Sequence, residues 1–254
     1  MPDFITTPEG RRIALHRTSG TGPAVMFLGG YRSDMTGTKA MFLEDWCWKQ
    51  GRACLRFDYS GHGASGGEFE DGCIGDWAAD AAAVLATVEG EAVLVGSSMG
   101  GWIALILARA MPERIAGLVT VAGAPDFTED LLWANWTEAE RREVTEKDVL
   151  HVPSDYGDPY PYTRRLIEDG RRQLVLRDPL DLPFPVRILQ GTADVDVPQE
   201  VALRLLAHVT GADIRATLVK GADHRFSTPE CLALIAQAVA EVSGMSGAGV
   251  TESR

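Results

Sequence analysis

Short apolar runs alternate with longer amphipathic stretches along most of this chain. Six runs have the length and composition of buried strands, at residues 24–28, 53–57, 92–95, 115–121, 186–190 and 214–219. Between them, the helical spacing of apolar residues predicts helices over residues 38–50, 74–88, 102–109, 199–208 and 229–242. This alternation predicts an α/β fold with a parallel sheet that is covered by helices on both faces.

The N-terminal segment adds two strands of a different kind. Residues 3–6 and 12–17 have the pattern of an antiparallel pair, joined by a turn at Pro8-Glu9-Gly10. Together with the six buried runs, they predict a mostly parallel sheet of eight strands.

The alternation stops in the second half of the chain. Residues 125–182 are mostly polar with scattered aromatic residues, and ordinary connections are much shorter, so we expect an inserted helical cap. Thr137 and Glu140 have the spacing of a capping box, which predicts that a helix begins there. A second helix is expected over residues 162–175, and the stretch between the two helices is expected to be broken at Pro153, Pro159 and Pro161.

The rest of the chain carries no internal repeat and no linker. We therefore expect one domain over residues 1–242, with the cap inserted into it. Residues 243–254 are small and polar, which predicts a disordered tail.

Composition and charge exclude several classes of function. The 254-residue chain has a formal net charge of −12, so its surface is expected to repel nucleic acid and anionic membranes. No apolar stretch approaches the roughly 18 residues of a membrane span, and no signal peptide is visible, so a cytoplasmic location is expected. The cysteines lack the paired spacing of zinc or redox motifs, and we expect them to be buried and reduced: Cys47, Cys54, Cys73 and Cys231.

The strongest chemical signal lies at residues 96–100, Gly-Ser-Ser-Met-Gly. This Gly-x-Ser-x-Gly pattern follows a buried strand and opens a helix, which is the context of a nucleophile elbow. Gly96 and Gly100 leave room for a sharp turn that exposes Ser98 at the carboxyl end of the strand. The helix N-terminus favours negative charge that develops beside it. The pattern therefore predicts that Ser98 is a catalytic nucleophile.

A serine hydroxyl needs an adjacent base, and the chain contains five histidines. His224 follows the last strand, where the loop returns over the carboxyl edge of the sheet, so we expect it to be the base. His62, in a glycine-rich loop, is the one rival that could approach the elbow. The other three lie in an opening strand, in the cap and near a helix end: His16, His151 and His208.

The histidine in turn needs an acceptor that fixes its tautomer. Asp194 follows the penultimate strand and is the expected acid, which gives the chain order Ser, Asp, His. Asp196, in the same turn, and Asp126, after the strand that precedes the cap, remain alternatives.

An acyl-transfer site also needs donors for the oxyanion. The backbone N–H of Met99, the residue after the nucleophile, is expected to be one of them. Tyr31 is expected to supply the other, because Gly29 and Gly30 before it let the main chain approach a substrate closely.

These motifs together resemble the α/β-hydrolase superfamily. The pairing of Gly-x-Ser-x-Gly with Gly-x-x-Asp-x-x-Val-Pro at residues 191–198 and a late Asp-His is typical of it. More narrowly, residues 30–40, 56–61, 95–102 and 223–225 are similar to segments of the mitochondrial abhydrolase-domain proteins, which act as palmitoyl-protein thioesterases and acyl-glucuronide esterases. The resemblance implies the α/β-hydrolase fold and a triad of Ser98, Asp194 and His224.

The combined prediction is a serine hydrolase that cleaves carboxylic esters or thioesters through an acyl-enzyme, with no metal and no organic cofactor. The expected partner is a small-molecule ester or acyl-thioester, and an acylated protein is a further candidate. Alternatives on the same fold are an aminopeptidase, a carbon–carbon bond hydrolase and a non-catalytic ligand-binding protein.

Two groups of side chains are candidates for substrate binding. Arg32 and Arg225 flank the expected site and would pair with a substrate carboxylate. Aromatic residues of the cap would either line an acyl pocket or pin the cap to the body, with Trp133 and Trp136 as the candidates for the pocket among Trp133, Trp136, Tyr156, Tyr160 and Tyr162.

Overall fold

Eight strands form one mostly parallel sheet, as the sequence predicts. The computed structural model describes residues 1–154 and 157–244. The spatial order is β1-β2-β4-β3-β5-β6-β10-β12; β2 pairs antiparallel with β1 and β4, and the other neighbours pair parallel. The bounds are β1 Asp3–Thr6, β2 Arg12–Thr18, β3 Thr21–Leu28, β4 Arg52–Phe57, β5 Ala92–Ser97, β6 Ile115–Val121, β10 Val186–Gly191 and β12 Ile214–Val219.

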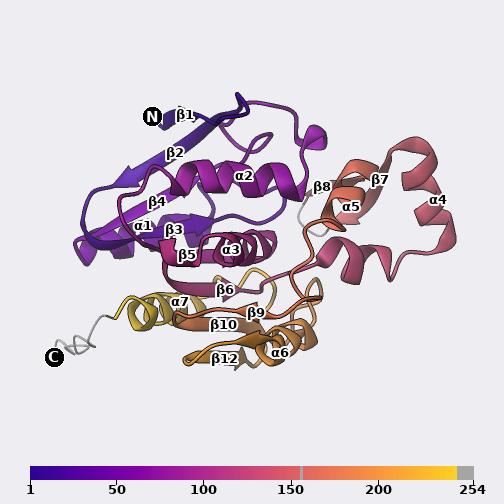
Figure 1. The fold of residues 1–254 in the computed structure, drawn as a ribbon. Helices are drawn as coiled ribbons and strands as arrows, with labels where there is room; N and C mark the ends of the chain where they lie inside the picture. The colour runs from indigo at the N-terminus through magenta and orange to yellow at the C-terminus, as the bar shows by residue number, and fades with distance from the viewer. Residues whose placement is uncertain (155–156, 245–254) are drawn as a thin grey trace.

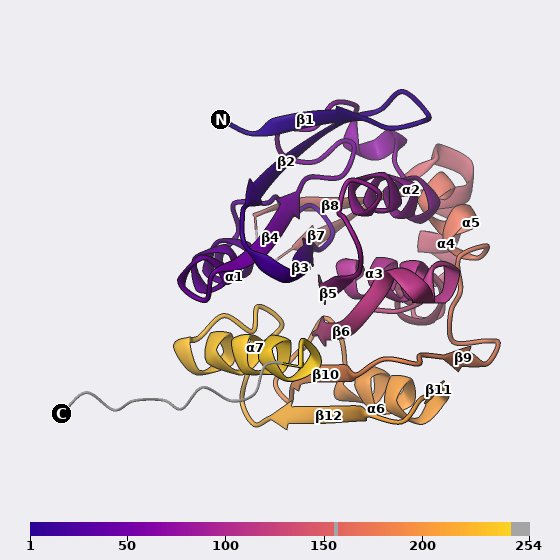
Figure 2. The ribbon, with the colours of Figure 1, turned by 60° about the vertical axis from the view of Figure 1, so that its left-hand side comes forward.

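Helices cover both faces of this sheet (Figure 2). In β5, Val93 and Val95 pack into the core on one face and Leu94 into the core on the other, because successive side chains of a strand alternate. All three are fully buried, which explains why the parallel strands read as continuous apolar runs. One face is covered by α1 (Thr38–Lys49) and α7 (Pro229–Val242), the other by α2 (Ile74–Leu85), α3 (Met99–Ala110) and α6 (Gln199–His208).

The cap leaves the sheet after β6 and returns before β10 (Figure 1). It consists of a π-helical segment η3 (Thr128–Trp133), the helices α4 (Glu138–Lys147) and α5 (Arg164–Gly170), and an antiparallel hairpin of β7 (Val149–Ser154) and β8 (Gly157–Thr163). Shorter elements complete the chain: η1 (Phe69–Asp71), η2 (Pro112–Arg114), β9 (Leu180–Asp181) and β11 (Val209–Thr210).

The hairpin corrects the expectation of a purely helical cap. The predicted helix over residues 162–175 is wrong in extent, since Tyr162 belongs to β8 and α5 ends at Gly170. The prolines that were expected to break the chain lie in the hairpin instead; a two-stranded ribbon leaves each strand one open edge, so a residue without an N–H is tolerated there. The helix expected from Thr137 is confirmed as α4, with a complete capping box between Thr137 and Glu140.

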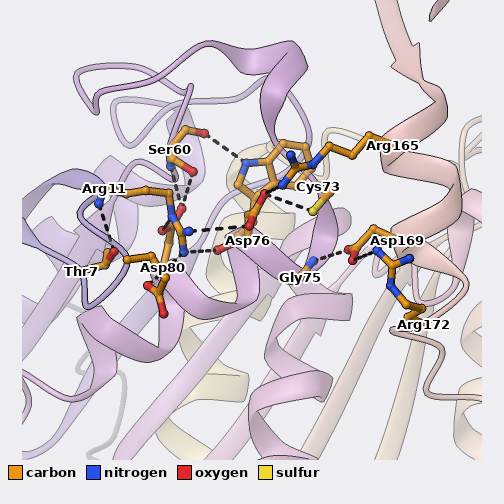
Figure 3. Close-up of polar contacts among 12 residues, drawn as sticks. Thr7, Arg11, Ser60, Cys73, Gly75, Asp76, Asp80, Arg165, Asp169 and Arg172 are labelled. Atoms are coloured by element: carbon orange, nitrogen blue, oxygen red, sulfur yellow. Dashed lines mark hydrogen bonds and ion pairs between the residues drawn. The ribbon is translucent and has the colours of Figure 1, made fainter. Parts of the chain in front are cut away.

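Ion pairs and hydrogen bonds attach α5 of the cap to the N-terminal turn of α2 (Figure 3). Arg165 Nη2 lies 2.6 Å from Asp76 Oδ2, and Asp169 Oδ2 accepts from the Gly75 N–H at 2.6 Å. Arg11 continues this network along α2 by contacting both Asp76 and the fully buried side chain of Asp80. The base of the cap is thereby fixed to the body of the molecule.

The structure also bears on the cysteines, on membrane-spanning helices and on the C-terminal tail. The four cysteines are free and buried, as predicted. No helix within the described residues is long and apolar enough to cross a membrane. The predicted disordered tail lies almost entirely outside the described residues, as does the cap residue Tyr156.

Candidate active site

β5 and α3 meet at a sharp turn that presents Ser98. This residue has φ 54° and ψ −121°, a conformation that side-chain-bearing residues rarely adopt and that is common at functional sites. Its N–H donates to the Val121 carbonyl at 3.0 Å, which holds the turn against β6. A Cβ at Gly100 would lie 2.1 Å from the Leu28 oxygen, and a Cβ at Gly96 2.3 Å from the Gly100 oxygen. Both positions therefore require glycine.

Ser98, His224 and Asp194 form a continuous hydrogen-bonded line. His224 Nε2 lies 3.1 Å from Ser98 Oγ, and His224 Nδ1 lies 2.8 Å from Asp194 Oδ2. Because a carboxylate only accepts, Nδ1 carries the proton, and Nε2 accepts from the serine hydroxyl. The structure thus brings together the three residues expected from the sequence, each from the end of a different parallel strand: β5, β12 and β10.

Asp194 is held from several directions. Its side chain is fully buried, Oδ2 also accepts from Gln190 Nε2, and Oδ1 accepts from the N–H groups of Asp196 and Val197. Burial raises the pKa of Asp194, but the hydrogen bonds from His224, Val197 and Gln190 outweigh this effect and leave the pKa below its ordinary value. The carboxylate therefore stays ionised beside the imidazole.

The two expected oxyanion donors lie beside the nucleophile. Met99 is the first residue of α3, where an N–H has no partner within the helix. The loop after β3 passes so close that a Cβ at Gly30 would lie 3.3 Å from Ser98 Cβ, and Tyr31 follows directly. Met99, Gly30 and Tyr31 line the same cavity as Ser98. Their role as donors stays a prediction.

A cavity of about 700 Å³ opens at Ser98 and His224, within the range of small-molecule sites. The cap supplies an apolar and aromatic part of its wall, from Phe127, Leu131, Leu132, Val152, Tyr160 and Tyr162. A second part is polar and comes from the loop after β3, the first turn of α1 and the loop after β12.

Comparisons with known proteins show the family to which this chain belongs. Residues 35–241 match the model of the alpha/beta hydrolase family. The chain belongs to the α/β-hydrolase family. The human mitochondrial palmitoyl-protein thioesterase ABHD10 is 34% identical over 226 residues, which cover 87% of this chain and 73% of the relative.

Solved structures extend the likeness over nearly the whole chain. Mouse alpha/beta hydrolase domain-containing protein 10 superimposes with a TM-score of 0.89 at 30% identity, covering 97% of this chain and 100% of the mouse chain. A candidate hydrolase from Agrobacterium vitis S4 gives a TM-score of 0.92 at 42% identity, covering 95% of this chain and 98% of the other.

In this α/β-hydrolase, two of the three rivals, Asp126 and His62, are engaged elsewhere. Asp196 is exposed, whereas Asp126 is fully buried and accepts from the N–H groups of Val175 and Leu176, which ties down the chain after α5. His62 Nδ1 donates to the Ser60 carbonyl, and burial lowers the pKa of His62 to about 4. It is therefore neutral near pH 7 and packed among aromatic rings.

The two cap tryptophans do not line the cavity, which corrects the expectation that they shape an acyl pocket. Trp136 is buried behind the cavity wall, with its ring 5.9 Å from that of Tyr162. Trp133 packs between Trp136 and the guanidinium of Arg171. Both tryptophans therefore pack within the cap.

Three cationic side chains do line the cavity. Arg32 and Arg225, the two expected from the sequence, are exposed at its polar part. Lys39, in the first turn of α1, was missed; no sequence signal separates it from an ordinary surface lysine. Its Nζ donates to the Arg225 carbonyl. Burial lowers the pKa of Lys39 to about 8, against the opposing attraction of the carboxylates of Asp223 and Asp194.

One group of side chains in the described part of the chain has ligand atoms close enough to hold a metal ion: Asp194, Asp196 and His224, within 4.8 Å of one another. The donor set is shared with the hydrogen-bonded line, because Asp194 already accepts from His224 Nδ1. A cation held by both residues would have to displace that proton.

Proposed function

We propose that this protein is a serine hydrolase that cleaves carboxylic esters or thioesters through an acyl-enzyme on Ser98. The observation that carries the proposal is the hydrogen-bonded line from Ser98 through His224 to Asp194, which opens into a cavity with an apolar wall. A weak nucleophile, a base in reach of it and a group that orients the base are the three parts that acyl transfer needs.

In the first half of the reaction, Ser98 Oγ attacks the acyl carbon while His224 Nε2 takes the hydroxyl proton. Asp194 stabilises the imidazolium, and the N–H groups of Met99 and Tyr31 hold the tetrahedral oxyanion. His224 then gives its proton to the leaving alcohol or thiol. In the second half, His224 takes a proton from water, the water oxygen attacks the acyl carbon, and the acid leaves as Ser98 regains its proton.

The proposed substrates carry an apolar acyl chain. The cap side of the cavity is lined by leucine, valine and aromatic side chains, which suit such a chain. Relatives named palmitoyl-protein thioesterase support a thioester of a long fatty acid, including one carried on a protein.

Labelling with a fluorophosphonate probe and an activity screen test this proposal. We expect wild-type protein to be labelled at Ser98 and to hydrolyse p-nitrophenyl esters and acyl-thioesters of increasing chain length. Ser98→Ala should lose labelling and turnover, the latter on the order of 10⁶-fold, while circular dichroism stays unchanged. Absence of labelling and of turnover in the wild type would favour a non-catalytic binding protein, and full activity of Ser98→Ala would exclude the serine mechanism.

A further inference from the structure

The turn at residues 30–33, called here the oxyanion loop, is bonded to the cap by two side chains. The Tyr31 hydroxyl donates to the Pro161 carbonyl, and Arg32 Nη1 donates to the Pro159 carbonyl at 2.8 Å. Both acceptors belong to β8 of the cap hairpin, whereas Tyr31 and Arg32 follow β3 in the centre of the sheet. The segment that holds a proposed oxyanion donor is therefore bonded to the part of the molecule that covers the substrate.

The ring of Tyr31 lies between the cap and the body. It stacks on Tyr162 of β8, with ring centroids 5.3 Å apart and planes at 17°, and meets the edge of Tyr160 at 5.9 Å. On the body side it contacts Phe69 at 4.8 Å and Trp77 at 5.9 Å. Burial holds the pKa of Tyr31 well above its ordinary value, so the hydroxyl remains a donor at any pH the protein would meet.

The backbone of the oxyanion loop is tightly constrained. Arg32 has φ 53°, which is uncommon for a residue with a side chain and persists where the surroundings enforce it. Ser33 closes the turn, since its N–H donates to the Gly30 carbonyl and its Oγ accepts from the Gly30 N–H, both at 3.2 Å. A shift of this turn would change the direction of the Tyr31 N–H relative to Ser98.

We propose that Tyr31 and Arg32 are positioning residues through which the docked cap hairpin fixes the oxyanion hole. The inference rests on the acyl-transfer function proposed above. The hairpin then has a second role besides covering the acyl chain, because the carbonyls of Pro159 and Pro161 hold the loop in the geometry that stabilises the transition state. Acceleration depends on these cap contacts even for a substrate too short to touch the cap.

Kinetics of Tyr31→Phe, Arg32→Met and the double variant test this inference. Tyr31→Phe removes the hydroxyl but keeps the stacked ring, so it is expected to fold. With p-nitrophenyl acetate we expect kcat to fall about threefold to tenfold in each single variant and further in the double variant, with KM nearly unchanged. Complete loss of one oxyanion donor costs roughly 10²- to 10³-fold, and a displaced donor loses part of this. Arg32→Lys, which keeps a donor, should recover part of the rate.

A boronic acid provides a readout that a purely structural role would not change. Phenylboronic acid forms a tetrahedral adduct with a catalytic serine, so its inhibition constant should rise in step with the loss of kcat. The matched control is Arg171→Met, which breaks contacts with Glu129 and Trp133 inside the cap and touches neither the cavity nor the oxyanion loop. All rates are expressed per active site titrated with fluorophosphonate, and Arg171→Met is expected to match the wild type.

Three outcomes would overturn the inference: unchanged kcat and boronate affinity in the folded double variant, a rise in KM with kcat unchanged, or an equal loss in Arg171→Met. Failure of the proposed function is distinguishable, because it would show as activity retained in Ser98→Ala or as a wild type that is neither labelled nor active.

Discussion

Asp194 and Asp196 are two residues apart in one turn, but they differ in their exposure to solvent. The carboxylate of Asp194 is fully buried and bonded to His224, while Asp196 is exposed and donates its backbone N–H to Asp194. An acid that orients a histidine acts by fixing the tautomer, which requires a direct bond to Nδ1. At the residue scale, this bond favours Asp194 over Asp196 as the acid of the proposed triad.

Substituting each carboxylate by its amide tests this assignment. We expect Asp194→Asn to lower kcat roughly 10³- to 10⁴-fold, because an amide nitrogen facing Nδ1 favours the wrong tautomer. Asp196→Asn should change kcat far less, since the backbone bond to Asp194 remains. Steady-state kinetics on a short activated ester make the comparison, and a larger loss in Asp196→Asn would show that the acid is misassigned.

At the scale of elements, the cap is assembled from pieces with separate attachments. α5 is bonded to α2, the hairpin is bonded to the oxyanion loop, and η3 contributes Leu131 and Leu132 to the cavity wall. Trp136, which the sequence offered as an acyl contact, lies behind Tyr162. We therefore expect the aliphatic side chains of the cavity wall to set the acyl-chain preference.

Leu132→Ala probes that wall. We expect kcat/KM for long-chain p-nitrophenyl esters to fall about tenfold, because one lost apolar contact in a pocket is worth roughly 1–3 kcal/mol. Hydrolysis of the acetate ester should change less than about threefold, since the acetyl group is too short to reach the wall. Leu203→Ala is the matched control, because Leu203 is exposed on α6 away from the cavity. Equal losses for short and long esters would remove Leu132 from the acyl site.

At the scale of the whole molecule, the charge around the cavity contrasts with the charge of the chain. The formal net charge is −12, whereas the cavity lining carries three cations and two carboxylates: Arg32, Lys39, Arg225, Asp34 and Asp196. Burial disfavours the protonated form of Lys39 and lowers its pKa to about 8. The cytoplasmic location and the single domain over residues 1–242 stay predictions.

Lys39 makes global stability depend on pH in a definite direction. With a pKa of about 8 in the folded chain and about 10.4 when unfolded, the unfolded state binds more protons between these values. Stability should therefore rise with pH across this window, relative to Lys39→Met. Urea midpoints at pH 7 and pH 9.5 measure the effect. Lys49→Met, an exposed substitution on the same helix, should parallel the wild type; if Lys39→Met also does so, the pKa of Lys39 is not lowered.

The sequence by itself determined the sheet and its helical layers, and it predicted Ser98 as the nucleophile and His224 as the base. A strand buried on both faces must be apolar along its length. The strands β3, β5 and β6 can therefore be predicted from the sequence without knowledge of the strands beside them. The elbow at Ser98 can be predicted as well, because the turn has no room for side chains at Gly96 and Gly100, which is a local steric requirement. Ser98 follows β5 and His224 follows β12. Because these strands run parallel, both residues lie at the carboxyl edge of the sheet.

Only the tertiary structure decided which acid faces His224, where the cap tryptophans lie and how the cap folds. Periodicity shows that a residue is buried, but not what it is buried against. The hairpin carries prolines that disfavour strands locally, and it is held by contacts with a loop about 130 residues earlier, such as Tyr31 with Pro161. The lowered pKa of Lys39 likewise arises from burial between segments far apart in sequence, because desolvation depends on everything that surrounds a charge.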